Sequence, residues 1–392
     1  MARADLDQPS ALRQLLVSRG LAADADDEAL LTTARSAEHK LHITVLSARE
    51  SAGQPLTTDQ RVELAAYRDR QQVYRAAWSI VSAAAPHAQV VKGWTIGDHY
   101  PPGMLRSAGD LDVVCPLAEL WLAARALLDE GWAVEAFTLF PAGPGSELDV
   151  SGWCHVLMEL MRPADCDQID EPYGVELRTA DVATSIRVPA WRPDGPPLPA
   201  TAANVLALSA ERWERPFRTR DIYDLAILTH LLDRTAIESL NTALAQTMLW
   251  PAYRELSRLL LRSGLCQPPP QPGGSQAAWR ARAARLRHSA LLWAHPLRAI
   301  GLFATSTVDA DRGALPDRLA RGVHRRIGSW RLLRLGLPLF AVPLAETEAE
   351  PADGLTLDHR GGHLVARTPV GSFLLVAGSC PEEWLEEASA RR

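Results

Sequence analysis

Apolar residues recur at helical spacing in the first part of the chain. The pattern predicts helices within residues 1–50, where Leu30, Leu31 and Ala34 lie on one apolar stripe between residues 24 and 46. Gly53 to Pro55 interrupt this pattern, and Thr57 to Gln60 then form a capping-box sequence. We therefore expect a long amphipathic helix that begins there and ends near Ala85, before Pro86.

Short apolar runs separated by turn residues follow this helical region. They predict a helix over residues 117–130 and strands at 90–91, 111–115, 132–140, 148–161, 173–178 and 184–188. Because strands and helices alternate, the sequence predicts an α/β fold with helical flanks.

The second half of the chain reads as helices, a linker and a small β region. Helices are expected over residues 201–214 and 219–232, after a Pro-rich connector at 190–200. A further pair of helices is expected over residues 237–261, with a break at Trp250-Pro251. Gln267 to Ser275 is the clearest linker, and it separates an Arg-rich region, an acidic loop at 341–351 and strands at 355–378 from the rest. We predict three parts: an N-terminal helical region (1–85), a core with a helical bundle (86–266) and a C-terminal Arg-rich domain with a small sheet (276–392).

The composition narrows the class of protein. Of the 392 residues, 47% are hydrophobic and the net charge is −6, which is not typical of a chain that binds nucleic acid over its whole surface. No apolar run approaches the roughly 18 residues of a membrane span, and no signal sequence is evident, so we expect a cytoplasmic protein without a membrane partner. The five cysteines show no zinc spacing, and no serine-hydrolase, Walker or Rossmann motif is present.

The candidate chemistry lies between residues 90 and 115. Lys92-Gly93 ends one apolar run, Arg106 follows a Gly/Pro-rich turn, and Asp110-Leu-Asp112 begins the next run. Alternate strand residues share a face, so the two carboxylates should lie together and repel each other. A hard cation such as Mg²⁺ relieves that repulsion through oxygen ligands. The alternative is an Asp that caps a helix or closes an Asx-turn.

These residues resemble the signature of the nucleotidyltransferase (polymerase-beta-like) superfamily. The resemblance implies a nucleotidyltransferase-like α/β core with a mixed sheet. The order Lys-Gly, Tyr-Pro, Arg and Gly-Asp-Leu-Asp-Val-Val is similar to that of a bacterial branch of small nucleotidyltransferases. The superfamily usually has a serine after the glycine, where this chain has Trp94, and the spacer to Asp110 is longer than the common form.

A third carboxylate is what the resemblance implies on a strand beside Asp110 and Asp112. The apolar context and chain order make Glu159 the first choice, Glu176 the second and Asp149 the third. This residue would help to hold the metal and act as general base on the acceptor hydroxyl. The alternative for each is a solvent-facing acid on an alternating strand.

The helix predicted after Thr219 carries a second resemblance. Its Arg220-Asp221-Ile-Tyr-Asp224-Leu sequence is similar to a motif of nucleotidyltransferases of the abortive-infection toxin type. Asp221 and Asp224 share one helix face, and we expect them to pair with arginines rather than to take part directly in catalysis. Lining a nucleotide pocket is the other reading.

Residues 276–334 contain about a dozen arginines with three tryptophans among them, a pattern of nucleic-acid, phosphate or acidic-peptide recognition. Arginine stems that cover apolar helix surface are the alternative.

The resemblance implies a Mg²⁺-dependent transfer of a nucleoside monophosphate from an NTP, with ATP as the first candidate, to an acceptor. The acceptor could be a peptide, a small molecule or RNA. Asp110, Asp112 and Glu159 would hold the metal, while Lys92, Gly93 and Arg106 would bind the triphosphate. The alternative is a catalytically degenerate member of the superfamily that acts as a binding or scaffold protein.

Overall fold

The computed structural model describes most of the predicted core and part of the C-terminal region. The described residues are 9–141, 154–164, 172–182, 191–192, 197–213, 215–247, 249–269, 328–334, 338–344, 353–360, 363–376, 380 and 382–389. Asp149, the strand predicted at 184–188 and residues 270–327 of the predicted linker and Arg-rich region lie outside this description. No helix among the described residues has the length and apolar character needed to cross a membrane.

The fold is mixed α/β, as the sequence predicted. The described strands form one nine-stranded sheet in the order β1-β2-β5-β4-β3-β6-β9-β8-β7. The strands are β1 (Gln89–Val91), β2 (Asp110–Val114), β3 (Ala133–Pro141), β4 (Cys154–Arg162), β5 (Tyr173–Arg178), β6 (Leu339–Pro343), β7 (Thr356–Arg360), β8 (His363–Thr368) and β9 (Gly371–Val376). Strands β2 and β5 are parallel, and the other neighbouring pairs are antiparallel.

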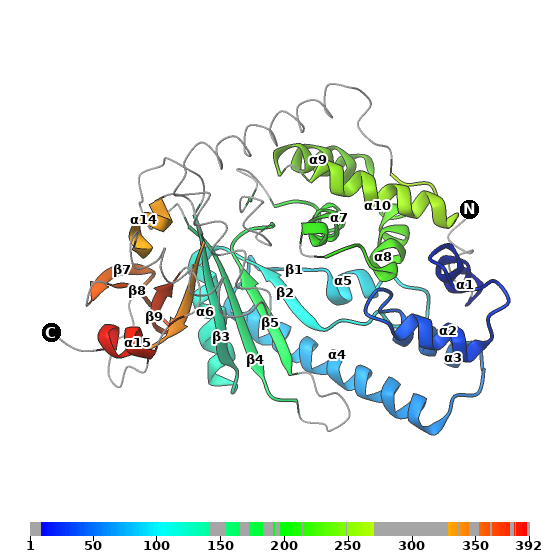
Figure 1. Cartoon of the computed structure of the whole chain (residues 1–392), viewed down its shortest axis with the longest axis horizontal. Coiled ribbons are helices and arrows are strands. Elements are labelled where there is room, and N and C mark those ends of the chain that lie inside the picture. The colour runs from blue at the N-terminus through cyan, green and yellow to red at the C-terminus, as the bar shows by residue number, and fades with distance from the viewer. Residues whose placement is uncertain are drawn as a thin grey trace.

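Most of the helices lie at the β1 end of the sheet or along it, whereas α14 and α15 lie at the other end, beside β7, β8 and β9 (Figure 1). The helices are α1 (Pro9–Ser18), α2 (Asp27–Arg35), α3 (His42–Ser51), α4 (Thr58–Ala84), α5 (Gly93–Gly97), α6 (Leu117–Asp129), α7 (Ala200–Ala210), α8 (Thr219–Thr229), α9 (Arg234–Gln246), α10 (Trp250–Ser263), α14 (Ser329–Arg334) and α15 (Glu382–Ser389). The capping box predicted before the long helix is confirmed: Thr57 and Gln60 exchange side-chain and backbone hydrogen bonds at the start of α4.

In β2 and β5, the residues that face the main core alternate with charged residues on the other face. Alternate residues of β2 and β5, such as Leu111 and Val175, enter a core with Tyr74 of α4 and Trp121 of α6. The intervening residues of each strand therefore point to the opposite face. The period-two pattern thus separates the packing residues from the candidate site.

A second core joins the N-terminal helices to the helices that follow the first five strands. Leu15, Leu46, Tyr223 and Leu256 come from α1, α3, α8 and α10 and are all fully or almost fully buried within it. Segments near the start and the middle of the chain therefore form one helical unit, which Figure 1 shows beside β1 and β2.

The C-terminal strands extend the main sheet, whereas the sequence predicted a small sheet in a separate domain. Phe137 of β3 is the register partner of Ala341 of β6. The Phe137 ring also packs on Phe373 of β9, with 5.3 Å between the ring centroids. The start of the predicted acidic loop at 341–351 is likewise strand, because residues 341–343 belong to β6.

Two local predictions also need correction. The helical stretch predicted from 24 to 46 is broken between α2 and α3, where Lys40 has a positive φ of 49° that a helix does not accommodate. The break predicted at Trp250-Pro251 occurs just before Trp250, and Pro251 lies in the first turn of α10, where its missing N–H costs nothing.

We expect Phe373→Ala to destabilise the whole sheet. Removing a buried phenylalanine ring costs about 3–5 kcal/mol, and the contact with Phe137 places that loss in the shared core. Urea unfolding followed by far-UV circular dichroism should show the main transition at lower urea. Leu122→Ala on α6, where the side chain is 55% exposed, is the control and should change little. A main transition unaffected by Phe373→Ala would mean that β6–β9 fold independently.

Candidate active site

Strands β2 and β5 carry acidic side chains on the face of the sheet opposite the main core. In β2, Leu111 and Val113 enter the core, so Asp110 and Asp112 point to the other face. Asp110 is exposed at the strand end, whereas Asp112 is only 3% exposed. The alternation predicted from the sequence is therefore present: both aspartates lie on one face, with Asp110 at the start of the strand and Asp112 deeper within the fold.

The third carboxylate beside this pair is Glu176. Glu176 of β5 is the register partner of Asp112 in the parallel β2–β5 pair, and register partners lie side by side on the same face. Gly174 is the partner of Asp110, so no side chain stands beside Asp110 on β5. The register therefore places the three carboxylates on one face of β2 and β5, with no side chain of β5 next to Asp110.

Glu159, the first choice from the sequence, lies one strand farther out. It is the register partner of Glu176 on β4, and its side chain is exposed. The strand order β2-β5-β4 places β5, not β4, next to Asp112. The structure thus brings together Asp112 and Glu176, the second choice, and leaves Glu159 at the margin.

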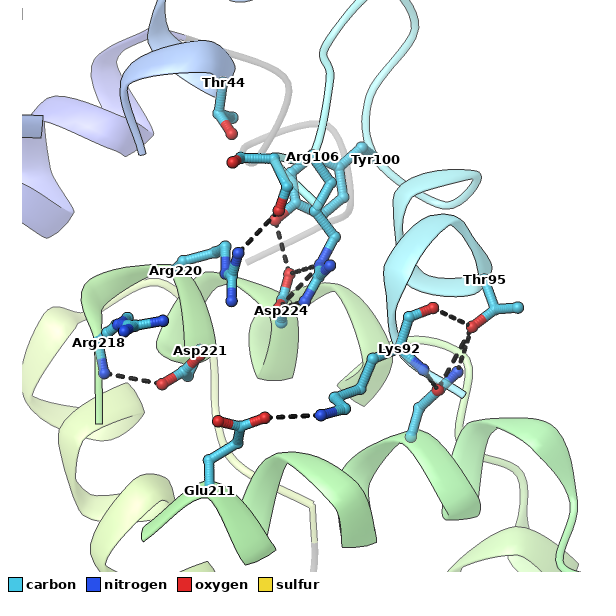
Figure 2. Close-up of polar contacts among 12 residues, drawn as sticks. Thr44, Lys92, Thr95, Tyr100, Arg106, Glu211, Arg218, Arg220, Asp221 and Asp224 are labelled. Carbon is cyan, nitrogen blue, oxygen red and sulfur yellow. Dashed lines mark hydrogen bonds and ion pairs between the residues drawn. The ribbon is translucent and has the colours of Figure 1, made fainter. Parts of the chain in front are cut away.

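Lys92 reaches the carboxylates from the turn after β1. Its Nζ lies 2.7 Å from Oε1 of Glu211 and 3.3 Å from Oδ2 of Asp112. Glu211 begins a 3₁₀ turn, Glu211–Trp213, directly after α7. Figure 2 shows the Lys92 side chain directed toward Glu211 across the space between the two elements. The ammonium thus bridges an acid of the sheet and an acid of the helical unit.

The backbone at Lys92 is left-handed and is held by polar contacts. Its φ is 62°, a region that non-glycine residues seldom adopt. The Lys92 N–H donates to Oδ1 of Asn204 at 2.6 Å, and the hydroxyl of Thr95 donates to the Lys92 carbonyl at 2.6 Å (Figure 2). Gly93 follows with a φ of 51° and begins α5. The turn at Lys92-Gly93 is therefore held in place and leads directly into a short helix.

The electrostatics of the cluster follow from burial and from its mixed charges. Burial opposes the charge on Lys92, but Asp112 and Glu211 outweigh it and raise the pKa of the ammonium. Burial likewise opposes ionisation of Glu211, yet Lys92 and Arg215 lower the pKa of that carboxyl to about 2. This contact is therefore a charged pair at neutral pH.

The other two affected acids have raised pKa values. The Asp112 carboxylate, and then burial, raise the pKa of Asp110. Burial raises the pKa of Glu176 to about 8, even though Arg178 partly offsets it. Nη1 of Arg178 lies 3.0 Å from Oε1 of Glu176 and 4.0 Å from Oδ1 of Asp112. Glu176 thus holds its proton near neutral pH in the metal-free protein.

Arg106 does not lie among these carboxylates. Its guanidinium pairs with Asp224 of α8, with Nε 3.0 Å from both carboxylate oxygens and Nη2 2.8 Å from Oδ2. Tyr100 donates its hydroxyl to the same carboxylate at 2.6 Å (Figure 2). Both charged side chains are almost completely buried. Arg106, predicted to neutralise a triphosphate, is instead committed to a structural ion pair.

The Arg-Asp-x-x-Asp sequence of α8 binds the loop before β2 and the segment that leads into α8. Arg220 donates to the Ser107 carbonyl at 2.7 Å. Asp221 accepts from Arg215 at 2.7 Å and from the backbone N–H of Arg218 at 2.7 Å. The expectation that Asp221 and Asp224 pair with arginines is confirmed. Helix α8 also contacts the loop that precedes Asp110, through the hydrogen bond of Arg220.

The same loop is fastened from the N-terminal helices. Thr44 of α3 donates to the Leu105 carbonyl at 2.8 Å. From α4, Arg70 donates to the Gly109 carbonyl at 3.1 Å, and the Tyr74 hydroxyl donates to that carbonyl as well. Residues 105–109 are therefore held from two sides, and this fixes where β2 begins.

The carboxylate oxygens of this site are of the kind that binds a hard cation, but they already pair with positively charged side chains of the protein. Asp110, Asp112 and Glu176 offer only carboxylate oxygens, the ligands that Mg²⁺ prefers. Within the described residues, no group of three or more His, Cys, Asp or Glu side chains is arranged to hold a metal ion. Lys92 and Arg178 stand against the same carboxylates, so a metal would have to displace at least the Lys92 contact.

Sequence reasoning did not select three residues of the site: Glu211, Asn204 and Arg178. Glu211 lies in an Ala-Glu-Arg-Trp-Glu-Arg sequence without a distinctive pattern. Arg178 follows Glu176 at the same-face spacing of two, which was the one available signal.

Comparisons with known proteins do not extend this picture. No family model matches the chain, and searches of curated proteins and of solved structures gave no match. The relation to nucleotidyltransferases therefore stays a prediction from the sequence motifs, and the geometry of the cluster is the independent observation.

Asp224→Asn should destabilise the protein by about 3–5 kcal/mol, because it leaves Arg106 buried without its ionic partner. Chemical denaturation measures this loss. Glu238→Gln makes the same kind of change in the exposed Arg234–Glu238 pair and should cost less than about 1 kcal/mol. Equal effects of the two substitutions would contradict a dominant role for the buried pair.

Glu176→Gln should change how stability depends on pH in metal-free buffer. The folded-state pKa of about 8 lies above the ordinary value of 4.5, so the folded protein binds the extra proton between these values. Its free energy of unfolding therefore falls as pH rises through that window. As the pH rises from about 5 to about 8, the free energy of unfolding of the variant should increase relative to that of the wild type. The expected change is more than about 1.4 kcal/mol, the equivalent of one pKa unit.

Denaturation curves measured with EDTA at several pH values test this. Glu159→Gln, the same substitution on the adjacent strand, gives the reference for the loss of an exposed charge. A difference between variant and wild type that stays constant with pH would show that Glu176 is not the proton-binding group.

Proposed function

We propose that this protein is a Mg²⁺-dependent nucleotidyltransferase that moves a nucleoside monophosphate from an NTP to an acceptor, with ATP as the first candidate donor. One observation carries the proposal: Asp110 and Asp112 share a face with Glu176, in register on the adjacent parallel strand. The Lys92-Gly93 turn supports it by delivering an ammonium to this same cluster.

The residues take roles that differ in part from those expected from the sequence. Asp110, Asp112 and Glu176 would hold the metal, with Glu176 in place of Glu159. Lys92 would neutralise phosphate oxygens as a compact cation with three donors. Arg106 acts indirectly, because its ion pair with Asp224 helps to fix the loop before Asp110.

The reaction requires a base and an oriented nucleophile. The acceptor hydroxyl attacks the α-phosphorus, a new O–P bond forms, and the bond to the bridging oxygen breaks so that pyrophosphate leaves. Glu176 accepts the hydroxyl proton in its ionised form, and a bound Mg²⁺ would favour that form by lowering the pKa that burial raises in the metal-free protein. A bound Mg²⁺ would supply charge stabilisation for the phosphates.

A second function is favoured by the contacts of Lys92 and Arg178. Their positive charges already satisfy Asp112 and Glu176, an arrangement in which the carboxylates need no metal. Together with Trp94 at the usual serine position, this favours a catalytically degenerate protein that binds a nucleotide or a partner without turnover.

Calorimetric titration with ATP, with and without Mg²⁺, tests the proposal. We expect Mg²⁺-dependent binding in the wild type and a loss of at least about tenfold, or 1.4 kcal/mol, in Asp112→Asn and in Glu176→Gln. Glu159→Gln is the matched control and should bind as the wild type does, because its side chain lies one strand away.

The outcomes separate the two functions. Equal binding with and without Mg²⁺ in the wild type would favour the degenerate binding protein. If no NTP binds, the nucleotide assignment fails. If Glu159→Gln abolishes binding and Glu176→Gln does not, the third carboxylate is Glu159 after all.

A further inference from the structure

Lys92 is held between two acids that belong to different parts of the fold. Its Nζ lies closer to Glu211, at 2.7 Å, than to Asp112, at 3.3 Å. All three side chains are at most 15% exposed. In such surroundings the ammonium interacts strongly with both carboxylates, because little water screens it.

A divalent cation at Asp112 would compete with this ammonium. Both need the carboxylate oxygens of Asp112, and two positive charges at one carboxylate repel each other. Metal entry therefore requires that the Lys92 head group move away from Asp112 or share it. The cost of that movement depends on where else the charge can be placed.

Glu211 offers that place, and the surrounding contacts hold it there. Its second carboxylate oxygen pairs with Arg215 at 2.8 Å, and Arg215 also pairs with Asp221 of α8 at 2.7 Å. The backbone of Lys92 is fixed by its N–H bond to Asn204. The backbone of Lys92 is thus held in place, while its ammonium group lies between Asp112 and Glu211.

We propose that Glu211 is a positioning residue that retains the Lys92 ammonium when a divalent cation occupies Asp112, and so sets the affinity of the site for the metal. This inference rests on the proposed function. Glu211 itself does not touch the metal; it lowers the cost of displacing Lys92 and leaves the ammonium beside the cation, where the phosphates of a nucleotide would lie.

The test measures metal binding rather than turnover. Free Mn²⁺ is followed by electron paramagnetic resonance while the protein is titrated, once with Mn²⁺ alone and once with α,β-methylene-ATP present. We expect Glu211→Gln to weaken Mn²⁺ binding by at least tenfold, because Lys92 then depends on Asp112 alone. Glu255→Gln, which removes one negative charge from the exposed pair with Arg212 on the same turn, should leave the affinity unchanged.

A double-variant comparison distinguishes positioning from other effects. In a Lys92→Met background there is no ammonium to retain, so Glu211→Gln should no longer change Mn²⁺ affinity. A similar loss in both backgrounds would overturn the inference, since it would reflect direct attraction between Glu211 and the metal or a damaged fold. Circular dichroism of each variant identifies damage to the fold independently.

The failure of this inference and that of the proposed function can be told apart. If the wild type binds Mn²⁺ and Glu211→Gln binds it equally well, only the role of Glu211 is wrong. If the wild type retains no Mn²⁺ under either condition, the metal assignment at Asp112 fails, and the inference fails with it.

Discussion

The burial of one carboxylate, that of Asp112, imposes the main constraint on this structure. A charge removed from water is tolerated only with a partner of opposite sign and with its hydrogen bonds satisfied. Lys92 is that partner, and it comes from a left-handed turn that costs conformational free energy. Asn204 stabilises the turn from α7, and Glu211 shares the ammonium. The position of α7 against β1 is thus tied to the charge of a single aspartate.

A second set of contacts makes the N-terminal helices part of the candidate site. The loop before Asp110 lacks regular structure of its own, so its carbonyl groups need partners from elsewhere. Arg70 and Tyr74 of α4 supply them at Gly109, and Arg220 of α8 does so at Ser107. Residues far apart in the sequence thereby fix the beginning of β2. The helical unit therefore helps to position the residues of the candidate site.

Much of the local structure could be predicted, because it depends on short-range patterns. The capping box at Thr57, the shared face of Asp110 and Asp112, and the ion pairing of Asp221 and Asp224 each follow from spacings of two to four residues. The partners across the fold could not be predicted in this way. Strand order decides that Glu176 adjoins Asp112, and it is not recorded in the order of strands along the chain.

Long-range partners also explain why the role of Arg106 was predicted wrongly and why Glu211 was not predicted at all. An arginine near an acidic motif suggests phosphate binding, but its partner Asp224 lies 118 positions later in the chain. Glu211 has no sequence pattern of its own, and its importance comes only from its distance to Lys92. Long-range pairing of charges was the information that the sequence pattern lacked.

The pairing of β3 with β6 has a consequence for how the protein is made. Phe137 and its partner Ala341 are separated by about 200 positions, and such distant pairing is slow to form. During synthesis β3 emerges long before β6, so its outer edge stays unpaired while the helices between them are translated. Open strand edges are templates for association with other chains. The nascent chain is therefore most exposed to aggregation in this interval, and completion of the sheet waits for the last part of the polypeptide.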